Sequence, residues 1–255
     1  TKNIYIDGVS QTISYTGSGS ASANLKFTDI QIGATLGYTG TNYFDGEIDQ
    51  VRIYNTALDS TDVSNLYAET VSDTSTLSFP SGKTAIATYQ LDGNSTDLSG
   101  NYNGTDTNVA YAYDGTELNI EYRFGRYGQA AVFNGSSSRI NLPTGDLRLG
   151  TNNFSISLWF NSANITQDNQ SLFWFQHYQN PIRIGATVSS SSSGGDKDIR
   201  FDCNVSGSGV IINTNSDILE SNTWYHAVFV KSSTTGMSIY INGVLVASNT
   251  SATGA

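Results

Sequence analysis

The sequence predicts an all-β fold, an antiparallel sandwich of two sheets with one short helix. Alternating or β-branched runs recur about every ten residues, and Asp-Gly, Asn-Gly and Gly-Ser pairs separate them. Only 13% of the residues are charged, and the many Ser, Thr, Asn and Gly residues suit short strands joined by polar turns. The expected strands span 3–7, 30–36, 48–54, 85–91, 129–133, 154–160, 224–230 and 238–242.

One helix is expected directly after residue 58. Asp59 has the side chain of an N-cap, and Val63, Leu66 and Tyr67 follow at the spacing of a single helical face. The sequence therefore predicts one short helix directly after a strand, with these three side chains on one face.

A long-period repeat bears on domain organisation. The pattern Ile-Tyr-Ile-Asx-Gly-Val occurs at 4–9 and again at 239–244, so the chain covers slightly more than one period. Residues 71–84 are polar, contain a Pro-Ser-Gly step, and are expected to be a linker.

The linker divides the chain into 1–70, with the later strands of a unit, and 85–255, with the earlier and central strands. A half-sandwich of 70 residues would leave an apolar face and sheet edges unpaired. Either the two segments close one sandwich, within the chain or between neighbours, or the chain holds two incomplete units of a tandem array. If one sandwich closes on itself, the two Ile-Tyr-Ile strands compete for one position.

Charge and hydropathy disfavour some partners. The net charge is −10 and Lys and Arg do not cluster, so nucleic acid is not an expected partner. No apolar run approaches the length of about 20 residues that a membrane helix needs, so membrane insertion is not expected. The single cysteine, Cys203, is expected to be a buried small apolar side chain.

Several ordered motifs resemble a known family. The chain has Tyr-Gln-Leu-Asp-Gly-Asn at 89–94, Trp-Tyr-His-Ala-Val at 224–228 and Ile-Tyr-Ile-Asn-Gly-Val at 239–244. Further matching blocks lie at 97–104, 131–143, 153–160 and, with the unit's ending, 44–58. Together they resemble the laminin-G-like jelly-roll family of the concanavalin A-like lectin and glucanase superfamily. The resemblance implies a two-sheet, concanavalin A-like jelly roll, and it leaves the ligand open.

The best candidate site is a structural calcium site. Six oxygen-bearing side chains, which suit a hard cation, fall within a dozen residues: Asp92, Asn94, Asp97, Ser99, Asn101 and Asn103. The alternative is that these side chains only form turns. Relatives in the superfamily often hold calcium between the first-strand region and an Asp in the closing strand, which implies Asp92 and Asp49, and the predicted set is Asp49, Asp92, Asn94 and Asp97.

Catalysis is not expected. The superfamily's glucanases carry Glu-x-Asp-x-x-Glu on one strand, whereas this chain has Glu47 and Asp49 followed by Arg52 at the third position. His177 and His226 are the only histidines, too few for a His-based triad or a His-rich zinc site.

Aromatic side chains are the expected contacts for a sugar, because a ring covers the apolar face of a pyranose. Alternation places Phe173 and Phe175 towards the core and Trp174 on the opposite face, where it either contacts a ligand or belongs to a second packed layer. The candidates are Trp174, Tyr178, Tyr102, Tyr111 and Tyr113. A second acidic cluster, Asp196, Asp198 and Asp202, alternates along a strand and is expected to be a solvated face.

Two functions fit these observations. The first is a non-catalytic carbohydrate-binding or adhesion module, outside the cell, on its surface or on a virion, with calcium ordering its loops. The alternative is a structural assembly protein, such as a phage fibre, capsid-decoration or surface-filament subunit, with virion or cell-surface proteins or further copies of itself as partners.

Overall fold

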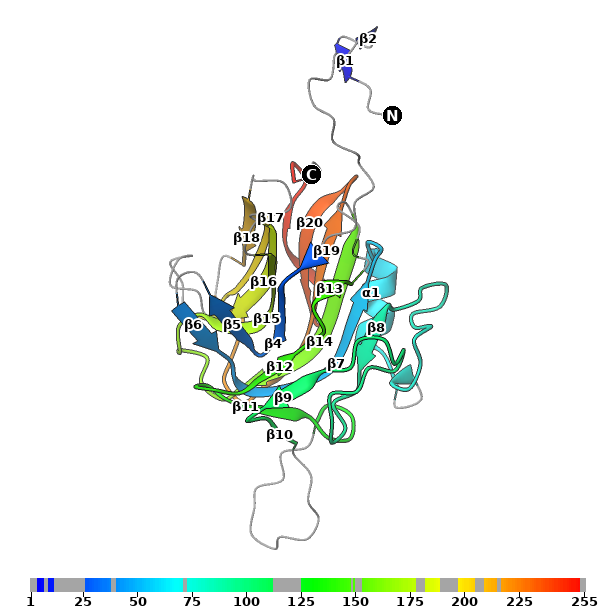
Figure 1. Ribbon diagram of the computed structural model, residues 1–255. Coiled ribbons are helices and arrows are strands. Elements are labelled where there is room, and N and C mark those ends of the chain that lie inside the picture. The colour runs from blue at the N-terminus through cyan, green and yellow to red at the C-terminus, as the bar shows by residue number, and fades with distance from the viewer. Residues whose placement is uncertain are drawn as a thin grey trace, which may run out of the picture.

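The computed structural model describes residues 4–6, 9–11, 26–37, 40–70, 73–111, 125–147, 149, 153–177, 182–188, 197–204, 209–214 and 217–252. Two large antiparallel sheets pack face to face (Figure 1). The predicted jelly-roll sandwich is confirmed.

The eight-stranded sheet has the order β10-β11-β7-β14-β19-β20-β21, and β8 also pairs with β7. Its strands are β10 (Ala110–Tyr111), β11 (Ala131–Asn134), β7 (Asp45–Tyr54), β14 (Phe154–Ser162), β19 (Trp224–Ser232), β20 (Gly236–Ile241), β21 (Val244–Asn249) and β8 (Ala87–Tyr89).

The seven-stranded sheet has the order β18-β17-β16-β15-β4-β12-β9. Its strands are β18 (Gly209–Asn213), β17 (Ile199–Asn204), β16 (Ile182–Val188), β15 (Gln170–His177), β4 (Asp29–Ile32), β12 (Arg139–Asn141) and β9 (Thr105–Thr107). The remaining strands form three two-stranded sheets: β1 (Ile4–Ile6) with β2 (Val9–Gln11), β3 (Lys26–Phe27) with β13 (Gly145–Asp146), and β5 (Ala34–Gly37) with β6 (Gly40–Tyr43).

Strands from before and after the 71–84 segment share both sheets. β4 lies between β12 and β15, and β7 lies between β11 and β14. The two segments are thus joined in one sandwich within this chain. The described part of 71–84 packs against β7, since Tyr54 donates a hydrogen bond to the Phe79 carbonyl at 2.6 Å and Arg52 donates one to the Asp73 carbonyl at 3.1 Å.

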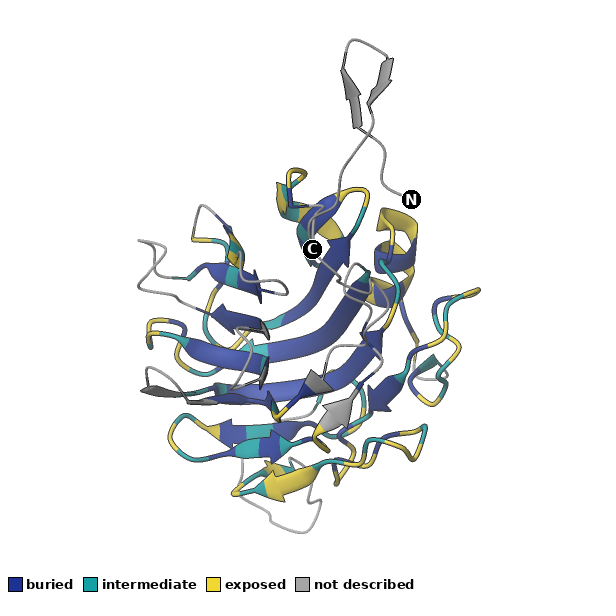
Figure 2. Ribbon diagram, turned by 45° about the horizontal axis from the view of Figure 1, so that its top comes forward, coloured by how far each residue is buried: buried dark blue, intermediate teal, exposed yellow. Residues whose placement is uncertain are grey.

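The core lies between the two large sheets (Figure 2). Phe173 and Phe201 of the seven-stranded sheet pack against Phe229 of the other sheet, with ring centroids 5.3 and 5.4 Å apart. Cys203 is 2% exposed, which confirms its predicted burial. Gly33 directly follows β4. Its φ is +78°, and a Cβ at this position would lie 2.1 Å from the Phe133 ring, so only glycine fits this turn. The expected strand 30–36 is therefore split into β4 and β5.

The helix α1 (Ser60–Tyr67) begins as predicted, because the Asp59 side chain accepts hydrogen bonds from the backbone N–H groups of Thr61 and Asp62. Val63 and Leu66 are fully buried against the outer face of the eight-stranded sheet. Tyr67, predicted on the same helical face, is 41% exposed. It lies at the rim of the covered surface, where its ring stacks on Trp159 at 5.7 Å.

The two copies of the repeated pattern have different places. β20 and β21 form the hairpin at the end of the eight-stranded sheet, with a turn at Asn242 and Gly243 that both have positive φ. The other copy, in β1 and β2, forms a two-stranded sheet of its own. In the described part of the chain, no helix is long and apolar enough to cross a membrane.

Candidate functional site

Asp49 and Asp92 hold the same short loop, 125–129. Asp49 Oδ2 accepts a hydrogen bond from the backbone N–H of Tyr127 at 2.9 Å, and Asp92 Oδ1 accepts one from that of Gln129 at 2.6 Å. Gly128 has φ +66° and a Cβ there would lie 2.3 Å from Asp92 Oδ1. The loop thus needs glycine where it passes the carboxylate.

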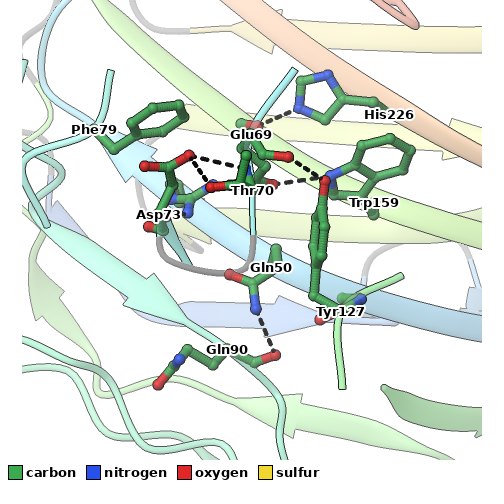
Figure 3. Close-up of polar contacts among 12 residues, drawn as sticks. Gln50, Glu69, Thr70, Asp73, Phe79, Gln90, Tyr127, Trp159 and His226 are labelled. Carbon is green, nitrogen blue, oxygen red and sulfur yellow. Dashed lines mark hydrogen bonds and ion pairs between the residues drawn. The ribbon is translucent and has the colours of Figure 1, made fainter. Parts of the chain in front are cut away.

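A bulge in β7 sets the direction of Asp49. Ile48 and Val51 both point into the core, and Gln50 between them has φ 48°, where the register with β14 shifts. The extra residue keeps Asp49 and Arg52 on the outer face of the sheet. Gln50 donates from its side chain to the Gln90 carbonyl at 3.3 Å, which joins the bulge to the segment before Asp92 (Figure 3).

Asp49 is a buried carboxylate with one oxygen unused. Its side chain is fully buried, and Oδ1 has no hydrogen-bond partner. Burial raises the pKa of Asp49 well above its ordinary value. The backbone N–H groups of Tyr127 and Gln50 oppose the rise, and the nearby negative charges of Asp92 and Glu69 add to it. A cation between the two carboxylates would compensate this unfavourable charge and give Oδ1 a partner, and the calcium site at Asp49 and Asp92 stays a prediction.

In the part of the chain that the structure describes, few other side chains could serve as ligands for a metal ion bound to Asp49 and Asp92. Among the described residues, no group of three or more His, Cys, Asp and Glu side chains could hold a metal ion. The two carboxylates would thus need backbone carbonyls and water as additional ligands, which is common for calcium.

Asn94 and Asp97 are engaged in the loop that follows Asp92. Asp97 is 1% exposed and accepts from the N–H groups of Thr88, Ser99 and Tyr102 and from the Ser99 hydroxyl. Asn94 is exposed and its Oδ1 accepts from the Thr96 N–H at 2.8 Å. These contacts are those of the turn interpretation, and the inclusion of Asn94 and Asp97 in a metal site stays a prediction.

Next to Asp49 lies a buried ion pair. Arg52 Nη1 is 2.5 Å from Glu69 Oε2, and both side chains are fully buried. Trp159 donates from Nε1 to Glu69 Oε1 at 3.0 Å, and Tyr127 donates from its hydroxyl to the Glu69 carbonyl at 2.6 Å (Figure 3). The segment after α1 is thereby tied to the loop that Asp49 holds.

His226 closes this cluster. It is fully buried, its Nε2 lies 2.9 Å from the Ser157 hydroxyl, and its ring lies 5.0 Å from that of Trp159. Burial, together with the positive charges of Arg52 and Arg126, lowers the pKa of His226 to about 3. The imidazole is therefore neutral at ordinary pH and part of the packing.

Trp174 lies on the outer face of the seven-stranded sheet, as the alternation predicts. Phe173 and Phe175 are buried in the core, while Trp174 is half-buried. Gly185 is its partner on β16, and a Cβ at 185 would lie 2.1 Å from Trp174 Cε3. The six-membered ring therefore occupies the space above Gly185, and its Nε1 donates to Gln176 Oε1 at 2.7 Å.

Polar side chains surround this ring on the same face. Gln31 is the partner of Trp174 on β4, and it donates to Asn141 Oδ1 at 3.4 Å. On the other side, Asp202 is the partner of Gly185 on β17. These polar groups are themselves buried, because Gln31 and Asp202 are each 2% exposed and Gln176 is 8% exposed, whereas Trp174 is half-buried.

The predicted solvated face at Asp198 and Asp202 is wrong. Each is 2% exposed. The Asp202 carboxylate accepts from Arg183 Nε at 3.1 Å and from Arg200 Nη2 at 2.8 Å, so the long arginine side chains cover it. Asp196 lies outside the described residues.

The tyrosine candidates are placed less favourably. Tyr102 and Tyr111 are half-buried against the core, and Tyr111 donates its hydroxyl to Asp106 at 2.8 Å. Tyr113 and Tyr178 lie outside the described residues. Of the five aromatic candidates, Trp174 alone is shown here with its ring on the outer face of a large sheet.

The acidic pair of the glucanase-like motif is enclosed. Glu47 is 3% exposed and Asp49 is fully buried. Arg52, at the position of the motif's second glutamate, forms the ion pair with Glu69.

A scan against family models matches the chain to a laminin-G model described as the concanavalin A-like lectin/glucanases superfamily, over residues 1–64 and 134–255. The chain belongs to this superfamily. No curated protein and no solved structure matched it.

The sequence did not indicate Tyr127, Glu69 or Gly185, which complete these sites. Glu69 and Tyr127 contact partners far along the chain, and no local pattern gives such a contact. Gly185 had one usable signal, since a glycine within a strand often marks close approach of another group.

Proposed function

We propose that this chain is a non-catalytic carbohydrate-binding or adhesion module that acts outside the cell or on a virion surface. The observation that carries the proposal is the half-buried Trp174 ring above Gly185, on the outer face of the seven-stranded sheet. Glycans are the proposed ligands.

The chemistry of the face suits a sugar. An aromatic ring covers the apolar face of a pyranose. Gln31, Gln176 and Asp202 are buried around Trp174, so the ring is the group that this face offers to a sugar. The hydrogen bond from Trp174 to Gln176 and the space provided by Gly185 fix the ring before binding. A fixed ring loses little conformational entropy when the ligand arrives.

Calcium is proposed as a structural ion between Asp49 and Asp92. Its support is the unpartnered Oδ1 of Asp49 and the loop that both carboxylates hold. When bound, calcium supplies positive charge and no chemistry. The role of these residues is to fix the 125–129 loop against β7.

The absence of catalysis is also part of the proposal. A glycosidase needs two carboxylates on either side of a substrate. Here Glu47 and Asp49 are buried and Arg52 stands where a second acid would be required, which supports a binding role.

A glycan array tests the proposal with the wild-type chain, Trp174→Ala and Trp174→Phe, each in calcium and in chelator. Wild type is expected to bind a defined set of glycans, Phe to retain part of the signal, and Ala to lose about 2 kcal/mol, or about 30-fold in affinity. Equal binding by wild type and Trp174→Ala would remove Trp174 from the site, and no binding by the wild type would remove the lectin function.

A second function, as a structural assembly subunit, is favoured by a different observation. The edge strands on one side of the sandwich are uncharged and expose large apolar side chains.

A further inference from the structure

Large exposed apolar side chains gather at one side of the sandwich. Ile211 is 41% exposed, Val244 64% and Leu245 50%, and they lie on β18 and β21. These two strands end their respective sheets. A groove of about 510 Å³ runs between them, lined by Ile212, Asn213 and residues 246–250.

β21 is an unprotected edge. Its sequence, Val-Leu-Val-Ala-Ser-Asn, has no charge and no proline. Edge strands usually carry lysine, proline or a cover, because their unpaired backbone groups otherwise pair with another strand. In the described residues, β21 is paired with β20 alone.

The same chain contains a hairpin, β1 and β2, that is not part of either large sheet. β1 and β2 pair only with each other among the described strands, and an isolated two-stranded hairpin is marginally stable in water. Its sequence repeats that of β20–β21, with Ile6 opposite Val9 as Ile241 is opposite Val244. The pattern at 239–244 shows that such a hairpin adds to this sheet, since β20 pairs with β19.

We propose that the hairpin of β1 and β2 from a second copy of this chain adds to the edge of β21. The backbone of β21 then gains a hydrogen-bonded neighbour, and side chains of the added strand lie beside Val244 and Leu245 on the two faces of the sheet. The contact joins two different surfaces, so each copy keeps one unused hairpin and one unused edge. Association therefore continues beyond a dimer, as in a fibre.

Charge sets the conditions. Each copy carries a net charge of −10, which opposes association at low ionic strength, while the paired strands themselves carry little charge. Added salt screens the repulsion, so the mass in solution is expected to rise with salt as well as with protein concentration.

The test uses three full-length variants in analytical ultracentrifugation or light scattering. Leu245→Lys places a charge on the acceptor edge, and Tyr5→Pro removes a backbone donor from the hairpin. Leu98→Lys is the control, because Leu98 is 37% exposed but lies outside both edge strands. Wild type and Leu98→Lys should associate, and the other two should be monomers with unchanged melting temperatures.

Mixing separates this interface from others. Leu245→Lys keeps its hairpin and Tyr5→Pro keeps its edge, so an equal mixture should give a one-to-one dimer that grows no further. Pairing of β21 with β21 would instead leave Tyr5→Pro associated, and docking of each hairpin on its own chain would leave the wild type monomeric. Either result, or a mixture that stays monomeric, would overturn the proposal.

Discussion

The variant Asp49→Asn distinguishes two explanations for the buried Asp49 side chain: a ligand of calcium or a protonated carboxyl group. The variant keeps the acceptor for the Tyr127 N–H and removes the charge that burial makes unfavourable. If calcium lies between Asp49 and Asp92, the wild type is stabilised by calcium and the variant is not.

The size of the effect follows from linkage. With a Kd of about 10⁻⁴ to 10⁻³ M, as in extracellular calcium modules, about 10 mM calcium stabilises the fold by about 1.4 to 2.7 kcal/mol. At about 2 to 4 °C per kcal/mol for a chain of this size, the melting temperature rises by about 3 to 11 °C.

The assay is thermal unfolding in calcium and in chelator, with Asp217→Asn as a matched control at an exposed aspartate. In chelator the pH adds a second readout. Because the folded pKa of Asp49 is raised, wild type gains stability relative to Asp49→Asn as pH falls through that pKa, down to the unfolded value near 3.8. A calcium shift of equal size in wild type and Asp49→Asn, or none in either, would refute the site.

Two more predictions concern the neighbouring cluster. Glu69→Gln leaves Arg52 buried without its counter-ion and should lower the free energy of unfolding, measured in urea, by about 3 to 5 kcal/mol. The control Lys83→Met breaks the more exposed ion pair with Asp62 and should lower the free energy of unfolding by less than about 1 kcal/mol. Equal losses in the two variants would contradict the importance of burial. The folded pKa of His226, about 3, lies below the ordinary 6.5, so its contribution to stability is full above 6.5 and is lost as pH falls towards 3; His226→Gln should weaken this acid dependence in denaturant titrations, and an unchanged profile would show that other groups cause it.

Periodicity and turn residues were sufficient for much of the fold. The alternation around Trp174 placed Phe173 and Phe175 correctly, and the Asp59 cap located the start of α1. Both signals are local, because a strand alternates faces and a cap acts within one turn.

Contacts between distant segments were not predictable in the same way. Alternation showed that Asp198 and Asp202 share a face, but the cover that Arg183 and Arg200 give to Asp202 depends on the order of β16 and β17. The pairing of Asp49 with Asp92 came from the family resemblance, and the loop that both carboxylates hold was found only in the structure.

The most direct test of the carbohydrate-binding account is the glycan-array signal of Gly185→Val beside that of the wild type. The substitution keeps the aromatic and amide side chains of the face but displaces the ring, since a Cβ at 185 would lie 2.1 Å from Trp174 Cε3. The account predicts that the wild type binds and that Gly185→Val, assayed below its own melting temperature, loses at least about tenfold in affinity. Equal binding by both proteins would contradict it.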